Sequence, residues 1–93
     1  MAFIYLISSP SGGAGKSYVA DKLGLEFPVS GPDDFPPTTR VSELIHRGDN
    51  VVFTAVAHGE DIENITTVAM SYAKIAGTKF INVAMAAGPD HGE

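Results

Sequence analysis

The sequence has 93 residues, the size of one small domain, so residues 1–93 are expected to form a single unit. The 11 Asp and Glu residues outnumber the 6 Lys and Arg residues, and the net charge of −5 argues against direct nucleic-acid binding, which needs clustered cations. The absence of Cys excludes a disulfide scaffold and a thiolate zinc site. The apolar runs are far shorter than the ~20 residues of a membrane helix, and there is no signal-peptide pattern. We therefore expect a cytoplasmic protein without membrane association.

The chain begins with the pattern of a strand, a glycine-rich loop and a helix. Ala2–Ile7 is a nearly unbroken apolar run, typical of a strand that is buried on both faces of a parallel sheet. Ser8–Lys16 contains one Pro and three Gly residues, which interrupt any regular pattern. Helical spacing starts near Lys16, and Gly24 suits the position that follows a helix.

A proline-rich segment comes next. Glu26–Pro37 contains four Pro residues, and neither a helix nor a strand tolerates that density of proline. The sequence therefore predicts an irregular loop over this whole segment. A loop of this length in so small a domain is more often a functional lid than a simple connector, although an ordinary surface loop is nearly as good an interpretation.

A short helix and a second strand are predicted in the middle of the chain. Thr38 or Thr39 can cap a helix that buries a few apolar residues on one face and closes at Gly48. Val51–Ala57 then has the same unbroken apolar character as the first predicted strand, so it is expected to be a second buried strand.

The clearest helical pattern follows, with a wide apolar face, a cap at Asp61 and an end at Gly77. Phe80–Ala86 predicts a third buried strand, and Ala87–Glu93 is expected to be a frayed tail. Strands that alternate with helices predict an α/β fold, in which a small parallel sheet of three to four strands is joined by right-handed crossovers and flanked by helices.

The glycine-rich loop carries the clearest functional pattern, because it lies between a predicted strand and a predicted helix. Glycines allow successive backbone N–H groups to point inward, and such groups bind a polyphosphate together with the positive end of a helix. Lys16 can reach the terminal phosphates as the catalytic cation, and the Ser17 hydroxyl can ligate Mg²⁺. The candidate site residues are Ser11, Gly12, Gly13, Ala14, Gly15, Lys16 and Ser17.

This segment resembles the Walker A motif of P-loop NTPases. The register of Gly12–Ser17 is similar to the deviant Lys-Gly-Gly-x-Gly-Lys-Thr/Ser loop of the ParA/MinD family of partition ATPases, with Ser11 at the position of that family's signature Lys. Pro10 stands where the general motif has Gly, a position that is commonly not Gly in that family. The segment is also similar to the Pro-Ser-Gly-x-Gly-Lys-Ser loop of nucleotide kinases, with one residue inserted. The resemblance covers about a quarter of the chain. It implies a P-loop NTPase-like fold, with ATP or another nucleoside triphosphate and Mg²⁺ as ligands.

A P-loop enzyme also needs a carboxylate near Mg²⁺, usually at the end of a strand beside the first one. No acid directly follows Val51–Ala57, and Thr54 inside that segment carries no charge. Glu60 and Asp61 are the nearest acids, but a capping role at the next helix explains both of them. The sequence therefore leaves this carboxylate unassigned.

Several other polar residues have possible ligand roles without any supporting spacing. His58 lies at a strand end, Asp33 and Asp34 lie in the proline-rich segment, and either Arg40 or Arg47 can balance phosphoryl charge. Solvated surface positions are the simpler interpretation for all of them. The C-terminal residues Asp90, His91 and Glu93 resemble a metal-binding trio only superficially and receive no role.

Three functional hypotheses follow. The first is a Mg-ATP-binding P-loop protein whose weak hydrolysis depends on a dimer or another partner. The second is a phosphotransferase, a kinase for a small molecule or nucleotide, with the proline-rich segment as acceptor lid and Asp33 or Asp34 as base. The third is a non-catalytic nucleotide-sensing interaction module. Because so small a sheet leaves its edges open, we also expect a homodimer or another homo-oligomer, or pairing with another protein.

Overall fold

The structure is a computed structural model and describes residues 1–12 and 15–86. Over these residues the chain folds into four strands and three helices, in the order β1 (Ile4–Ser9), α1 (Lys16–Leu23), β2 (Leu25–Pro28), α2 (Thr38–His46), β3 (Val51–Val56), α3 (Glu60–Ala76) and β4 (Phe80–Ala84). The strands form one parallel sheet in the order β2-β3-β1-β4. This confirms the predicted α/β class with a small parallel sheet.

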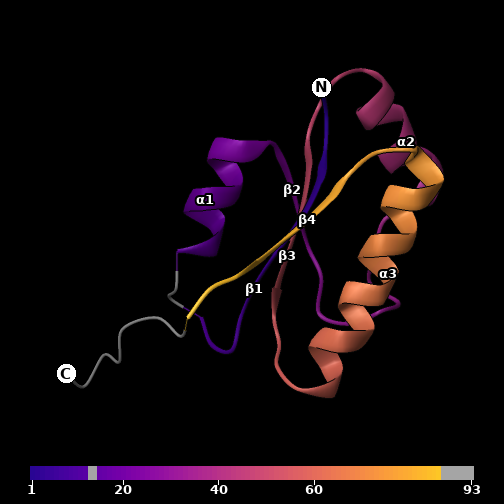
Figure 1. Cartoon of the computed structure of the whole chain (residues 1–93). Coiled ribbons are helices and arrows are strands. Elements are labelled where there is room, and N and C mark those ends of the chain that lie inside the picture. Colours follow the sequence, from indigo (N-terminus) through magenta and orange to yellow (C-terminus); the bar gives the residue numbers. More distant parts are fainter. Residues whose placement is uncertain (13–14, 87–93) are drawn as a thin grey trace.

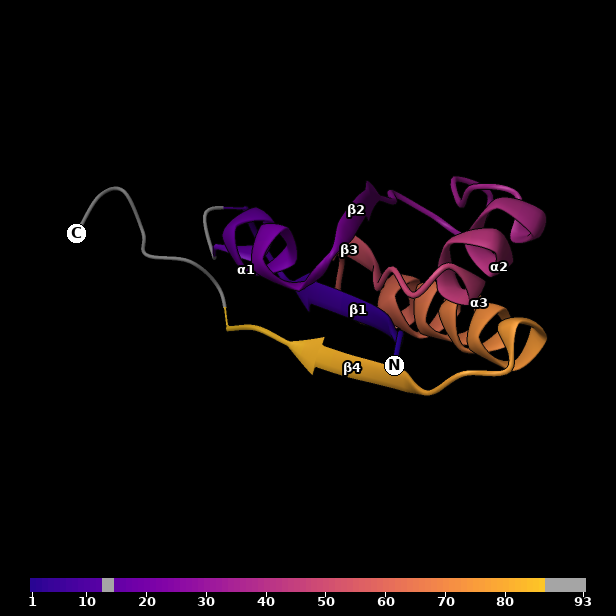
Figure 2. The same ribbon diagram turned by 90° about the horizontal axis from the view of Figure 1, so that it is seen from above.

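The helices cover the two faces of the sheet unequally, as Figures 1 and 2 show. Helix α1 lies alone on one face, whereas α2 and α3 lie together on the other. The larger part of the core fills the space between the sheet and the α2–α3 layer, and a smaller cluster centred on Ile7, Ala20 and Val52 lies under α1. The molecule therefore has three layers, with β1 and β3 at the centre of the middle one.

The central strands are buried because their sequences are apolar on both faces. In β3 every residue from Val51 to Ala55 is buried, and in β1 only Tyr5 is partly exposed. The register of their pairing places Ile7 beside Thr54 and Ser9 beside Val56. Since all strands are parallel, the loops after β1 and β3 leave the sheet at the same edge.

An aromatic cluster joins the proline-rich segment to the core. The ring of Phe35 lies 4.8 Å from that of Phe53 and 5.4 Å from that of Tyr72, measured between centroids. The Tyr72 hydroxyl donates a hydrogen bond of 2.5 Å to the carbonyl oxygen of Pro36, and burial raises the pKa of Tyr72. The second half of this segment is therefore packed against α3.

The expectation that Glu26–Pro37 contains no strand is wrong, because its first residues belong to β2. The Leu25 N–H donates to Asn50 O, and the Val29 N–H donates to Thr54 O. Backbone groups of alternate residues face the neighbouring strand, so the position of Pro28 faces away from β3 and needs no N–H. An edge strand tolerates proline at such a position.

The predicted helix caps are also wrong in detail. Pro37 is the N-cap of α2, so Thr38 and Thr39 lie inside the first turn. Gly59 is the N-cap of α3, so Asp61 lies inside its first turn, and neither helix has a side-chain capping bond. The acidic residues at the start of α3 still lie at the positive end of the helix, where negative charge is favourable.

The ends of several elements differ from the prediction by a few residues. The predicted strand Ala2–Ile7 is displaced to Ile4–Ser9, and the last strand ends at Ala84 instead of Ala86. Gly77 follows α3 with φ of 70°, a left-handed conformation that favours glycine and confirms the predicted end of this helix. The expected tail, residues 87–93, lies outside the described residues.

A polar contact closes the end of the sheet opposite the glycine-rich loop. Asn50 Oδ1 accepts a hydrogen bond from the Phe3 N–H, and Asn50 Nδ2 donates to Leu23 O, each at 2.8 Å. Gly24 packs directly against this residue, since a Cβ at Gly24 would lie 2.4 Å from Asn50 O. The turn from α1 into β2 thus requires a residue without a side chain.

We expect Gly24→Ala to lower the free energy of unfolding by about 1–3 kcal/mol, because the added methyl group forces the backbone near Asn50 to shift. Gly31→Ala is the matched control, since a Cβ at Gly31 meets no atom within 4 Å. Urea denaturation of both variants measures the difference. Equal stabilities would contradict this packing.

Candidate functional site

The glycine-rich loop connects β1 to α1 at the carboxyl edge of the sheet (Figure 1). Gly15 is the N-cap of α1 and has φ of 90°, which is a conformation that side-chain-bearing residues rarely adopt. At the other end of the loop, the buried Ser9 hydroxyl donates a hydrogen bond of 2.6 Å to Ser11 O. The candidate residues Gly13 and Ala14 lie outside the described residues.

The first backbone N–H groups of α1 lack partners within a helix, as at every helix start. Within residues 1–12 and 15–86, the N–H groups of Gly12, Gly15 and Lys16 donate no hydrogen bond to another described residue. Such groups, together with the positive end of the helix, suit an anionic ligand. A phosphate-binding loop at this position stays a prediction of the sequence.

A carboxylate that the sequence analysis missed lies beside this loop. Glu26 Oε2 on β2 accepts a hydrogen bond of 2.8 Å from Thr54 Oγ1 on β3 and another of 3.2 Å from Ser17 Oγ on α1. Thr54 is buried, Glu26 is half-buried and Ser17 is exposed. Three elements thus place one carboxylate oxygen within reach of the hydroxyl that was predicted to bind metal.

These groups line a hollow of about 280 Å³ at the carboxyl edge of the sheet. Its wall contains a cation, a carboxylate and three hydroxyl-bearing side chains, together with apolar residues of β2, β3 and the proline-rich segment. The lining residues are Lys16, Ser17, Glu26, Pro28, Val29, Ser30, Thr54, Ala55 and Val56. The structure therefore brings Lys16 and Ser17 together with a carboxylate in one hollow.

The chemistry of this donor set fits a magnesium ion that arrives with a phosphate ligand. Mg²⁺ prefers oxygen ligands and usually takes only one or two carboxylates from the protein, with water and phosphate oxygens as the others. Ser17 Oγ and Glu26 Oε2 supply oxygen atoms at 3.2 Å from each other. In the described part of the chain, no three His, Asp or Glu residues gather into a metal site built from protein alone.

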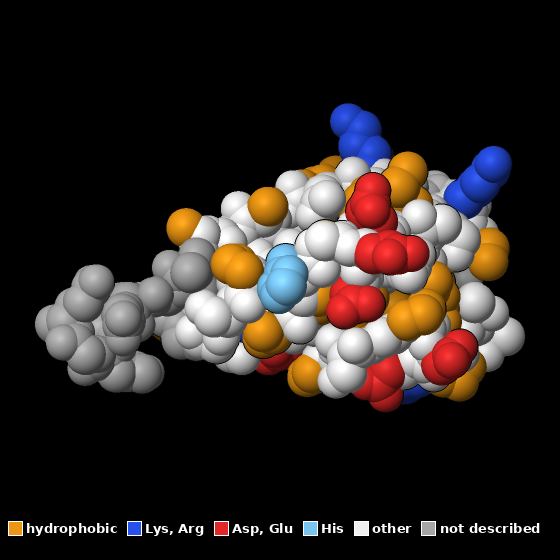
Figure 3. All heavy atoms as spheres, turned by 90° about the horizontal axis from the view of Figure 1, so that it is seen from below, with side chains coloured by type: hydrophobic (Ala, Val, Ile, Leu, Met, Phe, Trp, Pro, Cys, Tyr) orange, Lys and Arg blue, Asp and Glu red, His pale blue; other side chains and the backbone are white. Residues whose placement is uncertain are grey.

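The other predicted polar residues do not line this hollow within the described part of the chain. Glu60 and Asp61 lie in the first turn of α3, where their negative charge is favourable, but neither side chain makes the predicted cap. His58 is exposed between β3 and α3. The face in Figure 3 carries several acidic side chains, in keeping with the net charge of −5.

The residues of the proline-rich segment and α2 have local roles. Asp34 Oδ2 accepts a hydrogen bond of 3.0 Å from the Ser30 N–H, which fixes the turn after β2, and Asp33 is exposed. Arg47 forms an ion pair of 3.1 Å with Asp49, and Arg40 is exposed on α2. Asp90, His91 and Glu93 lie outside the described residues.

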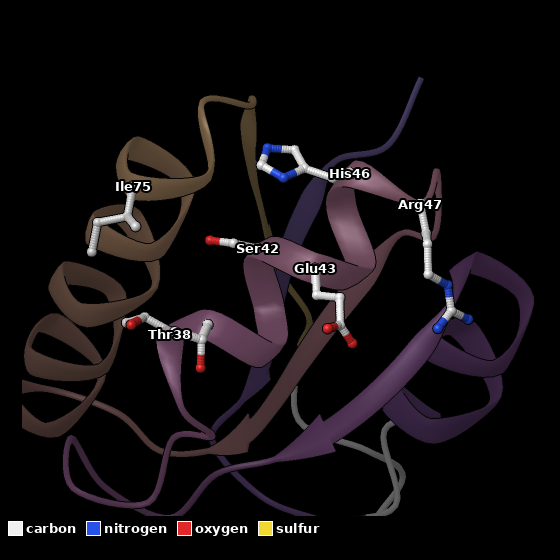
Figure 4. Close-up of a pocket in the computed structure, with 7 residues that line it drawn as sticks. Thr38, Ser42, Glu43, His46, Arg47 and Ile75 are labelled. Atoms are coloured by element: carbon white, nitrogen blue, oxygen red, sulfur yellow. The ribbon is translucent and has the colours of Figure 1, made fainter.

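A second, larger hollow of about 570 Å³ lies between α2 and α3 on the opposite face of the sheet. In Figure 4 the Ser42 side chain points from α2 toward Ile75 on α3, whereas Glu43 and Arg47 point away from α3. The hollow therefore does not collect charged groups around a common centre, and it gives no indication of a particular ligand.

Comparison with known proteins finds no matching family model, no similar curated protein and no similar solved structure. Among residues 1–12 and 15–86, no helix combines the length and the apolar character that crossing a membrane requires. The loop after β1 and the hollow beside it are therefore the features of this chain that indicate a function.

We expect Gly15→Ala to lower the free energy of unfolding by about 1–2 kcal/mol, because alanine is strained at a φ of 90°. Gly15→Asn is the control, since asparagine adopts the left-handed conformation more readily and is expected to lose less. Chemical denaturation in the absence of ligand compares the two variants. An alanine variant as stable as the wild type would show that the loop does not hold this conformation.

Proposed function

We propose that this chain binds a nucleoside triphosphate, ATP in the first instance, together with Mg²⁺, and that it hydrolyses the nucleotide weakly. The observation that carries the proposal is the meeting of Lys16, Ser17 and Glu26 in one hollow, where β1 runs into α1 through the glycine-rich loop. A phosphate-binding loop and a carboxylate for magnesium are the two features that such a ligand needs.

The size of the hollow suits only part of a nucleoside triphosphate. At about 280 Å³ it is slightly smaller than typical small-molecule sites, which have roughly 300–1,000 Å³. The phosphate chain and the metal fit inside it, and the nucleoside lies at its rim. In this arrangement the backbone N–H groups of Gly12 and Gly15 donate to phosphate oxygens, and Lys16 balances the charge of the terminal phosphates.

The polar side chains have distinct tasks. Bound Mg²⁺ neutralises charge on the phosphate oxygens. Ser17 Oγ offers an oxygen ligand, and Glu26 holds the metal directly or through a water molecule. Thr54 donates to the same oxygen of Glu26 and so fixes the direction of the carboxylate from a buried position in β3. Glu26 therefore takes the role that the sequence analysis left without a residue.

We propose weak hydrolysis because the hollow lacks one part of an efficient phosphoryl-transfer site. Among its described lining residues there is no Arg to stabilise the charge that develops in the transition state. A partner, either another copy of this chain or a different protein, would supply that group. This is the dependence on a dimer or another partner that the first functional hypothesis contains.

A phosphotransferase is the second candidate, favoured by the position of the proline-rich segment. Val29 and Ser30, the first residues after β2, line the hollow, so an acceptor beside them would lie close to the terminal phosphate. Asp33 is then the available base, since Asp34 accepts from the Ser30 N–H. Release of ADP that depends on an added acceptor would identify this activity, whereas binding without turnover would identify a nucleotide sensor.

Mg-ATP is expected to raise the melting temperature of the protein, because a ligand at 100 times its Kd adds about 2.7 kcal/mol to the stability of the folded state. Lys16→Ala should abolish this shift. Lys22→Ala is the matched control, since Lys22 is an exposed lysine on the same helix, outside the hollow. Thermal denaturation with and without Mg-ATP measures both. The proposal fails if the wild type shows no shift with any nucleoside triphosphate.

Glu26→Gln should lower the affinity of the ATP-bound protein for Mg²⁺ by about 10- to 100-fold, because the substitution removes the negative charge of the side chain and keeps its size. Glu43→Gln, on the exposed surface of α2, removes the same charge elsewhere and is expected to change nothing. Calorimetric titration of Mg²⁺ into each protein at a fixed ATP concentration compares the two variants with the wild type. An unchanged magnesium affinity in Glu26→Gln would exclude this carboxylate from the metal site.

A further inference from the structure

The two edges of the sheet differ in how they hinder pairing with another chain. The β2 edge is four residues long, contains Glu26 and ends at Pro28. Short length, charge and proline are the usual protections of an edge strand. The β4 edge, Phe80–Ala84, is five residues long and contains no charge and no proline. Only the β4 edge thus lacks these protections.

The backbone groups on the outer side of β4 are available for pairing. The Ile4 N–H donates to Lys79 O, and the Met85 N–H donates to Ser8 O, so the pairing with β1 uses the odd-numbered residues around β4. Alternation along a strand therefore leaves the N–H and C=O groups of Phe80, Asn82 and Ala84 directed outward. In the part of the chain that the structure describes, no strand lies beyond β4.

The apolar side chains beside this edge are only partly covered. Ile81 and Val83 lie on the same face of the sheet as α1 and are half-buried. Helix α1 lies over β3, β2 and β1 but leaves β4 uncovered, as Figure 2 shows. A strip of half-exposed apolar side chains thus runs along the open edge.

We propose that the β4 edge pairs in the antiparallel direction with the β4 edge of a second copy of this chain, which joins the two sheets into one. The two-fold axis passes midway between the two Asn82 residues, so that Asn82 of each copy faces Asn82 of the other. Phe80 of each copy then faces Ala84 of the other, and Ile81 faces Val83.

A second copy fits this edge because the register is self-complementary. With Asn82 on the axis, every outward N–H group of β4 meets an outward C=O group, which is the hydrogen-bonded arrangement of an antiparallel pair. Ile81 and Val83 form the closer, non-hydrogen-bonded pair, which brings two β-branched side chains into contact. A two-fold interface of this kind uses the same surface on both copies.

Charge also favours this edge as the contact between copies. Each chain has a net charge of −5, so most contacts between two copies bring like charges together. The strand β4 contains no charged residue, and neither does β1 beside it. The proposed pairing therefore avoids a direct contact between acidic side chains.

The proposed dimer does not depend on nucleotide, so this inference stands apart from the proposed function. Antiparallel pairing reverses the strand direction between copies, which places the two carboxyl edges at opposite ends of the joined sheet. Each hollow beside Lys16 remains within its own copy. The dimer is therefore expected to form equally well with and without Mg-ATP.

The first experiment measures the mass of the whole chain in solution by light scattering after size exclusion, at high chain concentration. The wild type is expected at twice the mass of one chain, and Asn82→Pro and Asn82→Lys at the mass of one chain. Asn82→Pro removes an outward N–H that the single chain does not use, and Asn82→Lys places two like charges on the axis. Met70→Lys, at an exposed position of α3, is the control and should remain dimeric. Circular dichroism confirms that each variant is folded.

The second experiment tests the register. Because the natural chain has no Cys, Asn82→Cys introduces a single thiol per copy, which a short bis-maleimide should link into a covalent dimer. Met70→Cys is the control and should not be linked. A wild type with the mass of one chain at every concentration overturns the proposal. So does a dimer that survives in both Asn82→Pro and Asn82→Lys, or an Asn82→Cys variant that is linked no better than Met70→Cys.

Discussion

Parallel pairing of two strands that are buried on both faces is the constraint on which the rest of the molecule depends. Strands β1 and β3 fill the centre of the sheet, and their pairing places Ile7 beside Thr54. The chain must then leave both strands at one edge, which is where the glycine-rich loop begins. The pairing of β3 with β2 on its other side brings Thr54 beside Glu26. The candidate site is therefore a consequence of how the core is built.

The elements that could be predicted from the sequence are those whose pattern of apolar residues follows from burial in the core. The unbroken apolar runs predict β1, β3 and β4, and the periodic apolar face predicts α3, because a buried strand and a half-buried helix each need a distinct pattern. Lys16 and Ser17 could be predicted as candidate site residues because the glycine-rich motif and its place between a strand and a helix are both visible in the sequence. Their role in nucleotide binding stays a prediction.

The residues that the sequence analysis missed depend on partners far away along the chain. Glu26 lies 28 positions before Thr54, and only the pairing of β2 with β3 brings the two together. Strand β2 is missed when every proline is treated as incompatible with a strand. Pro28 is compatible because β2 is an edge strand and the backbone position of Pro28 faces away from β3. The alternation of Leu25, Glu26 and Phe27 is the signal that would have found this short strand.

The segment after β2 connects the hollow beside α1 to the core on the α3 side of the sheet. Val29 and Ser30 border the hollow on the α1 side, whereas Phe35 and Pro36 contact Phe53 and Tyr72 on the α3 side. The chain contains no Trp, so its near-ultraviolet signals come from tyrosine and phenylalanine. Tyr72 is therefore an intrinsic optical probe of the α3 side of the sheet, and one short segment joins it to the hollow beside Lys16.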